Sequence, residues 1–322
     1  MKKITLLLIL LSLNATSQSK KLKEVDKIID SYSKTTSIEA LAKKIDHDFK
    51  SDIEKTRAVF SWVASNVRYK TKNPYEITSP KVYVVTDEND LKRRLQEEDR
   101  KIISKVFNSK RAVCKGYALL FKELCDLLKI ENEIILGYIK NSPNQIDFIP
   151  KQKNHAWNAV KINDQWIFID VTYGAGYATN NVWRQKFNSN YFNIDKEVIK
   201  NTHYAKEPFW QKHVNQPTLR EFCTQPLYSN AAFSKTFEVL SPRSGKIRID
   251  KKRSDLELKI RGIDHTIKIQ YRFGKNGRLR SPLIKHNDSI SILRFRKSRK
   301  KSNLKIYFNN ELALEYLLVS RD

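Results

Sequence analysis

The segment Arg111-Ala112-Val113-Cys114-Lys115-Gly116-Tyr117-Ala118 places a cysteine at the predicted start of a helix. Two further segments follow along the chain: Asn154-His155-Ala156-Trp157-Asn158-Ala159-Val160, and then Trp166-Ile167-Phe168-Ile169-Asp170-Val171-Thr172-Tyr173-Gly174. A thiol, an imidazole and a carboxylate in this order are the parts of a nucleophilic acyl-transfer site. In such a site the thiolate attacks, the imidazole moves the proton and the carboxylate orients the imidazole. The sequence therefore predicts Cys114, His155 and Asp170 as catalytic residues.

The position of Cys114 at a helix start has two chemical uses. Unsatisfied backbone N–H groups and the positive end of the helix dipole favour a thiolate. The same N–H groups can hold the oxyanion of a tetrahedral intermediate. Downstream, apolar residues recur at three- and four-residue spacing, so one helix face is predicted to be buried: Tyr117, Leu120, Phe121, Leu124, Leu127 and Leu128.

The spacing of a predicted hairpin brings the imidazole and the carboxylate together. Strands are predicted for His155–Ile162 and Trp166–Tyr173, and Asn163-Asp164 between them is a two-residue turn signal. If the residues that flank this turn pair, His155 and Asp170 are diagonal neighbours on one face, ~7–8 Å apart. A loop of odd length would place them on opposite faces. The hairpin therefore predicts the contact between His155 and Asp170.

Three further residues are predicted to line the pocket around this site. Trp157 and Trp166 fall on the same predicted face of the hairpin, as core or pocket wall. Gly116 would allow a close approach of the backbone beside the nucleophile.

Helical segments precede the cysteine. Leu22–Tyr32 and Ile38–Phe49 have helical spacing, and Asp90–Phe107 is predicted to be a charged helix. Ser51-Asp52-Ile53-Glu54 is a capping box, which predicts a helix that runs to about Tyr69. A short β-prone run is predicted at Val82–Val85, and an irregular stretch from Gly176 to about Tyr228.

The N-terminus has the pattern of a signal peptide. Lys2 and Lys3 precede an apolar run, Ile4–Leu13, and Ala15-Thr16-Ser17 fits a small-residue cleavage site. The apolar run is too short for a membrane span. We therefore expect residues 1–17 to be removed from an exported bacterial protein, periplasmic or secreted.

The cysteine content favours a free thiol at position 114. The chain has three cysteines, an odd number for an exported protein. Cys114 and Cys125 lie on one predicted helix, where eleven residues span roughly 16 Å, too far for a disulfide. Cys223 could pair with either, but nothing in its local sequence requires it.

The last quarter of the chain differs in texture and charge. Short alternating strands from about residue 234 predict a small β-sandwich: Lys246–Ile249, Leu256–Ile260, Thr266–Phe273, Ile290–Phe295, Leu304–Phe308 and Leu312–Leu318. We expect an α+β fold with two domains after the signal peptide: a catalytic domain at 18–230, whose nucleophile helix packs on an antiparallel sheet, and a basic, β-rich domain at 231–322.

The net charge of the chain is +26, and residues 241–322 carry 22 Lys and Arg against 8 Asp and Glu, a net charge of +14. Outside the cytoplasm such a surface is expected to meet anionic cell-envelope polymers or membranes and no nucleic acid. The alternative is a solvated basic surface that has no specific ligand.

The three catalytic segments resemble the transglutaminase-like superfamily, within the papain-like cysteine fold. They resemble in particular its bacterial branch related to kyphoscoliosis peptidase. Tyr173 stands where Trp is more usual, and further on Tyr191-Phe192, His203-Tyr204 and Trp210-Gln211 resemble a downstream segment of the family, with Ala205 where Pro commonly follows. The resemblance covers roughly Asp52 to Gln211, and it implies Cys114 as nucleophile, His155 as general base and Asp170 as orienting group.

Three functions stay open at this stage. The leading hypothesis is an exported thiol-dependent hydrolase that cleaves amide bonds of peptide or protein substrates. Acyl transfer to an amine would run through the same thioester, and a non-catalytic envelope-binding scaffold is the third alternative. No cofactor is predicted, and no metal, because His203, His213 and Cys223 follow one another at ten-residue intervals that fit no common zinc spacing.

Overall fold

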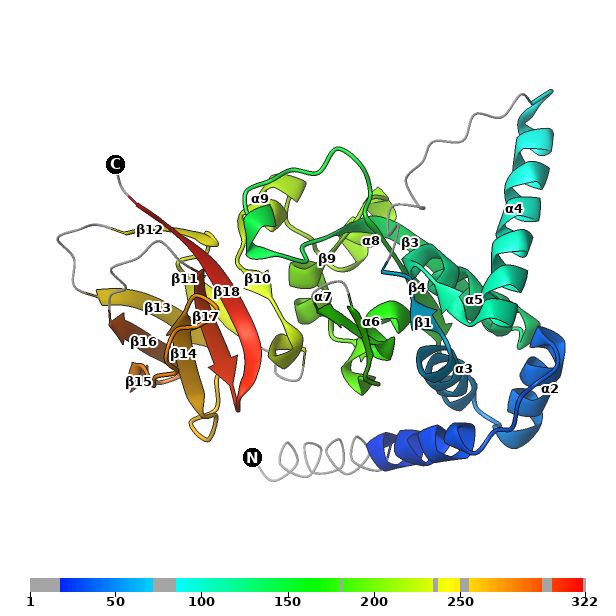
Figure 1. Ribbon diagram of the computed structural model, residues 1–322, viewed down its shortest axis with the longest axis horizontal. Helices are drawn as coiled ribbons and strands as arrows, with labels where there is room; N and C mark the ends of the chain where they lie inside the picture. Colours follow the sequence, from blue (N-terminus) through cyan, green and yellow to red (C-terminus); the bar gives the residue numbers. More distant parts are fainter. Residues whose placement is uncertain are drawn as a thin grey trace. The chain divides into compact units, whose positions relative to one another are not determined.

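The computed structural model describes residues 18–71, 85–179, 182–233, 237–249, 255–296 and 303–320 (Figure 1). The predicted signal peptide and most of the β-prone run at 82–85 lie outside these ranges. Among the described residues, no helix combines the length and the apolar character that crossing a membrane requires.

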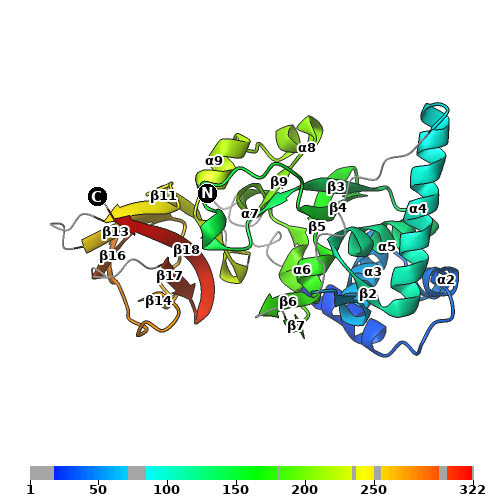
Figure 2. The same ribbon diagram turned by 45° about the horizontal axis from the view of Figure 1, so that its top comes forward.

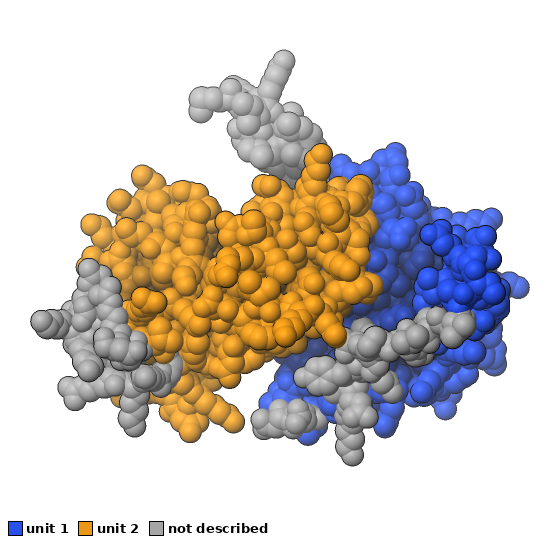
Figure 3. Space-filling model, turned by 90° about the horizontal axis from the view of Figure 1, so that it is seen from above, with its two compact units in different colours: residues 1–135, 156–193 blue, residues 136–155, 194–322 orange. Residues whose placement is uncertain are grey.

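Two compact units make up the chain, coloured separately in Figure 3. Residues 1–135 and 156–193 form one, and residues 136–155 and 194–322 form the other. The division falls within strand β3 and after the first residue of strand β4, although both strands belong to one hydrogen-bonded sheet. The boundary predicted near residue 230 stays a prediction; β10 (Leu227–Tyr228), just before it, pairs with β18 of the C-terminal region.

The helices predicted for the first unit are present, and α3 begins at its predicted cap. Residues 18–30 are helical, and the other helices are α2 (Ile38–Asp48), α3 (Asp52–Asn66), α4 (Glu88–Ser109) and α5 (Cys114–Leu127). The predicted capping box opens α3, with Ser51 N–H donating to Glu54 Oε2 at 3.1 Å. The helix ends three residues earlier than predicted, because Arg68–Tyr69 (β1) pairs in parallel with Arg111–Ala112 (β2). Helix α5 packs on α2, α3 and α4.

A five-stranded sheet carries the predicted site residues, in the order β8-β5-β4-β3-β9. Its strands are β3 (Asn132–Ile139), β4 (His155–Ile162), β5 (Gln165–Ile169), β8 (Phe192–Ile194) and β9 (His203–Ala205). β4 pairs with β5 and β3 with β9, both antiparallel. The register of the predicted hairpin is confirmed, since Ile162 pairs with Gln165 and both turn residues, Asn163 and Asp164, have positive φ.

The second predicted strand of the hairpin was too long. β5 ends at Ile169, and Val171–Ala175 forms a short helix, α6, instead of continuing to Tyr173. The reason is Asp170, whose Oδ1 accepts a hydrogen bond from Tyr173 N–H at 3.0 Å. An aspartate that caps the next turn in this way ends a strand.

The prediction of an irregular stretch after Gly176 was wrong. It contains β6 (Gly176–Thr179), β7 (Val182–Gln185), the 3₁₀ turn η3 (Ser189–Tyr191), α7 (Lys196–Thr202), α8 (Pro208–His213) and α9 (Leu219–Thr224). Each helix is six or seven residues long, too short for a periodic pattern. Local caps define two of them instead: the Asp195 side chain accepts from Glu197 N–H, and Thr218 and Glu221 form a capping box.

The segment between β3 and His155 is fixed at its ends. At the C-terminal end of α9, Lys140 Nζ donates to two backbone carbonyls, those of Phe222 and Gln225. The distance to Gln225 O is 3.0 Å. Burial of this amine lowers the pKa of Lys140 to about 7. At the other end, the Asn154 amide exchanges hydrogen bonds with the backbone N–H and C=O of Ile139, at 2.9 and 3.0 Å. His155 therefore enters β4 from an anchored residue.

The C-terminal region is a β-sandwich, as predicted. One sheet has the order β10-β18-β17-β14, with β12 beside β18, and the other has the order β11-β13-β16-β15. The strands are β11 (Glu238–Ser241), β12 (Lys246–Ile249), β13 (Asp255–Arg261), β14 (Ile269–Phe273), β15 (Leu283–Asn287), β16 (Ile290–Arg296), β17 (Asn303–Phe308) and β18 (Glu311–Ser320). Residues of both sheets share one apolar core, and Figure 2 shows the layers at an angle to each other. The sequence missed β11 and β15; all residues of β15 are exposed, so it has no apolar alternation.

Candidate active site

Cys114 is the first residue of α5, as predicted. Val113, which precedes it, is extended, and its carbonyl accepts from Gly116 N–H at 2.9 Å and from Tyr117 N–H at 3.2 Å. The cysteine is 2% exposed, and all three cysteines of the chain are free thiols. Tyr117, one turn on, donates from its hydroxyl to Val67 O at 2.6 Å and so fixes α5 against the end of α3.

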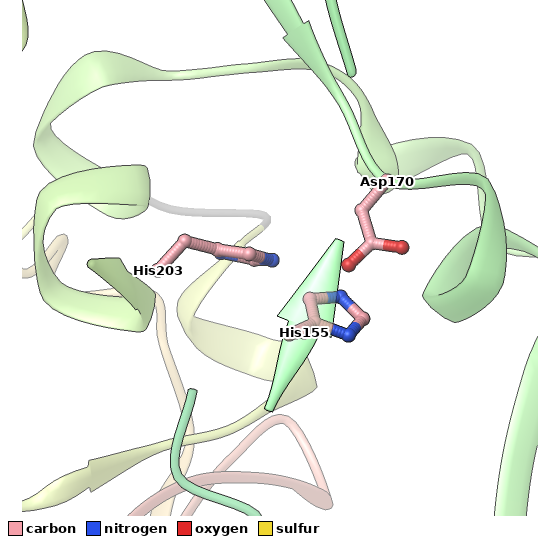
Figure 4. Close-up of side chains that lie close together, drawn as sticks. All are labelled: His155, Asp170 and His203. Carbon is pink, nitrogen blue, oxygen red and sulfur yellow. The ribbon is translucent and has the colours of Figure 1, made fainter. Parts of the chain in front are cut away.

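His155, Asp170 and His203 form one buried group. One ligand-type atom from each side chain lies within 4.8 Å of the corresponding atoms of the other two. In Figure 4 both imidazole rings point toward the Asp170 carboxylate. His155 opens β4, Asp170 follows β5 and His203 opens β9, so strands of one sheet place all three. The side chains of His155 and Asp170 therefore lie close together, as the hairpin predicted.

Tyr173 follows Asp170 in helix α6, and the charge of Cys114 is among the influences on its pKa. Tyr173 is half-buried, and loss of solvation of its phenol is the main cause that raises the Tyr173 pKa. The charges of Asp170, Tyr69 and Cys114 raise it further, in that order. The backbone N–H of Tyr173 donates to Asp170 Oδ1 at 3.0 Å. A direct hydrogen bond joins β4, which begins with His155, to α5, which begins with Cys114: Asn158 Nδ2 donates to Ala118 O at 3.2 Å.

Residues 39–171 match the sequence model of the transglutaminase-like superfamily. This segment is a transglutaminase-like domain. The match includes Cys114, His155 and Asp170, and it confirms the family that the sequence motifs indicated.

Two curated relatives extend the comparison. Kyphoscoliosis peptidase of Mus musculus is 23% identical over 203 residues, which are 62% of this chain and 28% of that protein. Hillarin of Drosophila melanogaster is 27% identical over 133 residues, 37% of this chain and 16% of that protein. This chain therefore spans less than a third of the length of these relatives. A solved structure described as "Crystal structure of a TGase" has a TM-score of 0.30 at 15% identity, covering 54% of this chain and 42% of its own, a similarity too low to support a conclusion.

His203 is the residue of the group that sequence reasoning missed. It belongs to the downstream segment that resembled the family, but nothing in its spacing indicated a place beside Asp170. Its register partner on β3 is Ile139, more than sixty residues earlier in the chain. The Nδ1 atom lies 2.8 Å from the Thr202 hydroxyl, which also donates to Val198 O at 2.9 Å.

The three predicted pocket residues have different surroundings. Trp157 is buried on β4, and Trp166 is half-buried on β5; the register places them on one face, as predicted. Gly116 is explained by packing in the transglutaminase-like domain. A Cβ at this position would lie 2.9 Å from both Ala112 Cβ and Val106 Cγ2, so the glycine lets α4 approach α5.

The group of His155, Asp170 and His203 also has the composition of a metal site. Two imidazoles and one carboxylate can ligate a divalent cation. This group differs from the set considered in the sequence, which was His203, His213 and Cys223. Within the described residues, His203 clusters with His155 and Asp170 instead. A metal here would occupy the same nitrogen atoms that proton transfer to a thiol requires, so the two uses are mutually exclusive.

Proposed function

We propose that this protein is a thiol-dependent acyl-transfer enzyme, and specifically a cysteine peptidase that cleaves amide bonds. The observation that carries the proposal is the buried group of His155 and Asp170, in a transglutaminase-like domain whose helix α5 begins at Cys114. A relative that carries the name peptidase supports hydrolysis of peptide bonds over other amides. A scaffold that only binds would require none of the three side chains.

The proposed reaction has two steps. His155 takes the proton from Cys114 Sγ, and the thiolate attacks the carbonyl carbon of the substrate amide. The oxyanion that forms is held by the backbone N–H of Cys114 at the helix start. His155 then protonates the departing amine, which leaves a thioester. In the second step His155 removes a proton from water, whose oxygen attacks the thioester and releases the acid and the thiol.

Asp170 and His203 are proposed as positioning residues for His155. The Asp170 carboxylate holds the His155 ring in the tautomer that accepts the thiol proton. Nδ1 of His203 is engaged by Thr202, which leaves Nε2 as the ring atom directed at the group. In one state the Thr202 hydroxyl donates to Val198 O, and Nδ1 of His203 donates to the Thr202 oxygen. Nε2 can then face a carboxylate only if it is protonated as well. If Thr202 donates to Nδ1, then Nε2 carries the proton. In both states an N–H of His203 faces Asp170 and fixes the carboxylate.

The reaction type is tested with a peptide library. We expect the chain purified without residues 1–17 to cleave some of the peptides, and cleavage to give a free acid in the presence of a primary amine. Mass spectrometry separates the acid from the amide of the added amine. If the product is mainly the amide of the added amine, the protein is an acyltransferase and not a hydrolase. Products of neither kind over the whole library would contradict the enzyme and favour a binding scaffold.

Export and a tether to the cell envelope belong to the same proposal. Their basis is the N-terminal pattern of residues 1–17 and the net charge of +14 over residues 241–322. Attraction between such a charge and an anionic surface is screened, because the Debye length is ~8 Å at 0.15 M salt. The Cys114→Ala chain is therefore expected to sediment with anionic lipid vesicles at low salt and to be released as salt rises. Equal binding to neutral vesicles, or no binding at low salt, would remove the electrostatic tether; cell fractionation of the full-length chain tests export.

A further inference from the structure

A cleft of about 470 Å³ lies in the first unit, in the size range of ligand sites. It is lined by residues of β1, β2, β7 and the segment after β1: Arg68, Tyr69, Lys70, Thr71, Arg111 and Trp183. Three of the six side chains are cationic, two are aromatic and none is acidic. The cleft is therefore lined by basic and aromatic side chains, and the ring centroids of Tyr69 and Trp183 are 5.6 Å apart.

Backbone hydrogen bonds tie this cleft to the nucleophile. Lys70 N–H donates to Ala112 O at 2.8 Å, two residues before Cys114. Arg111 lies three residues before Cys114, on β2, which leads directly into α5. The Tyr69 ring stacks on Tyr117, one turn into the same helix, with centroids 6.5 Å apart. A substrate that reaches Cys114 from this side would therefore pass over the cationic residues.

Two arginines lie directly beside each other in the cleft. Arg68 and Arg111 are register partners in the parallel pair of β1 with β2. Like charges on paired strands repel and destabilise the pairing. Both residues are exposed, and within the described ranges neither has a carboxylate at ion-pair distance. An anion bound between them would relieve the repulsion, and a carboxylate matches the fork of an arginine in two parallel hydrogen bonds.

We propose that this cleft is a substrate subsite that binds an acidic side chain of a peptide, close to the bond that Cys114 attacks. The inference rests on the proposed function and adds to it the class of substrate, a peptide with Asp or Glu beside the cleaved bond. Arg68 and Arg111 bind the carboxylate, and the rings of Tyr69 and Trp183 cover the adjoining chain.

The first experiment measures binding without catalysis. The Cys114→Ala chain is titrated calorimetrically with a short tri-glutamate peptide and with its tri-glutamine counterpart. A charge-assisted pair contributes about 1.5–3 kcal/mol, so we expect the glutamate peptide to bind about 10- to 100-fold more tightly. Arg68→Gln and Arg111→Gln should each remove most of this preference. Lys43→Gln, which removes a positive charge from an exposed position of α2, is the matched control and should leave it unchanged.

The second experiment follows cleavage. Among peptides cut in a Cys114-dependent manner, those with Glu beside the bond should have a kcat/KM about 10-fold or more above their Gln counterparts, and Arg68→Gln should lower only the rate for the Glu peptides. Cys114-dependent cleavage without this preference overturns the subsite and leaves the proposed function intact. Tight binding of the glutamate peptide without any cleavage refutes the function and retains the site. If inorganic phosphate displaces the peptide at equal concentration, the site recognises phosphate and the peptide assignment is overturned.

Discussion

Replacing Cys114 by alanine is expected to lower kcat/KM for a cleaved peptide by roughly 10⁴-fold or more, because the proposed thioester forms on its sulfur. His155→Ala should cost about as much, since a nucleophile and its base act as a unit and not additively. The double variant should therefore be little slower than either single one. Initial rates on the best peptide of the library measure all three.

Cys125→Ala is the matched control for the thiol. Cys125 is fully buried on the same helix, and burial raises its pKa, which keeps it protonated and unreactive. Loss of this thiol should leave the rate within a few-fold of wild type. Iodoacetamide should label Cys114 before Cys125, and circular dichroism should show that all variants fold. Wild-type turnover by the Cys114→Ala chain would rule out the mechanism.

Parts of the site could be predicted from the sequence because they depend on short-range geometry. A two-residue turn fixes the register of a hairpin, and the register fixes which residues share a face. His155 and Asp170 are only fifteen positions apart and lie on either side of such a turn. The start of α5 was equally local, since apolar spacing after Cys114 defines the buried face of the helix.

Other parts depend on contacts that spacing cannot supply. His203 reaches the group because β9 pairs with β3, and that pairing joins residues more than sixty positions apart. The end of β5 was missed because Asp170 was treated as a strand residue, although the same side chain caps α6. The basic cleft combines β1, β2 and β7, two-residue and four-residue strands without a periodic pattern.

The two roles of Asp170 predict a specific result for Asp170→Asn. The oxygen of the asparagine amide can still accept from Tyr173 N–H, which in the native chain is bonded to Oδ1 at 3.0 Å, so the fold should survive. Toward His155 the substitution presents an N–H where a carboxylate oxygen accepts, and the ring then adopts the wrong tautomer. We expect kcat to fall roughly 10²- to 10⁴-fold, less than for Cys114→Ala.

His203 gives the second half of this prediction, because its effect depends on the carboxylate it orients. His203→Ala should lower kcat about 10-fold and change the pH profile of kcat, whereas His203→Gln, whose amide N–H can reach the same place, should recover part of the rate. In the Asp170→Asn background the His203→Ala change should add little, since the group that it positions is gone. If His203 were purely structural, its loss would alter stability, would leave the pH profile of kcat unchanged, and would not show this non-additivity. A chelator separates the remaining alternative: activity that EDTA abolishes and Zn²⁺ restores would make His155, Asp170 and His203 metal ligands, and His155 could then no longer be the base for Cys114.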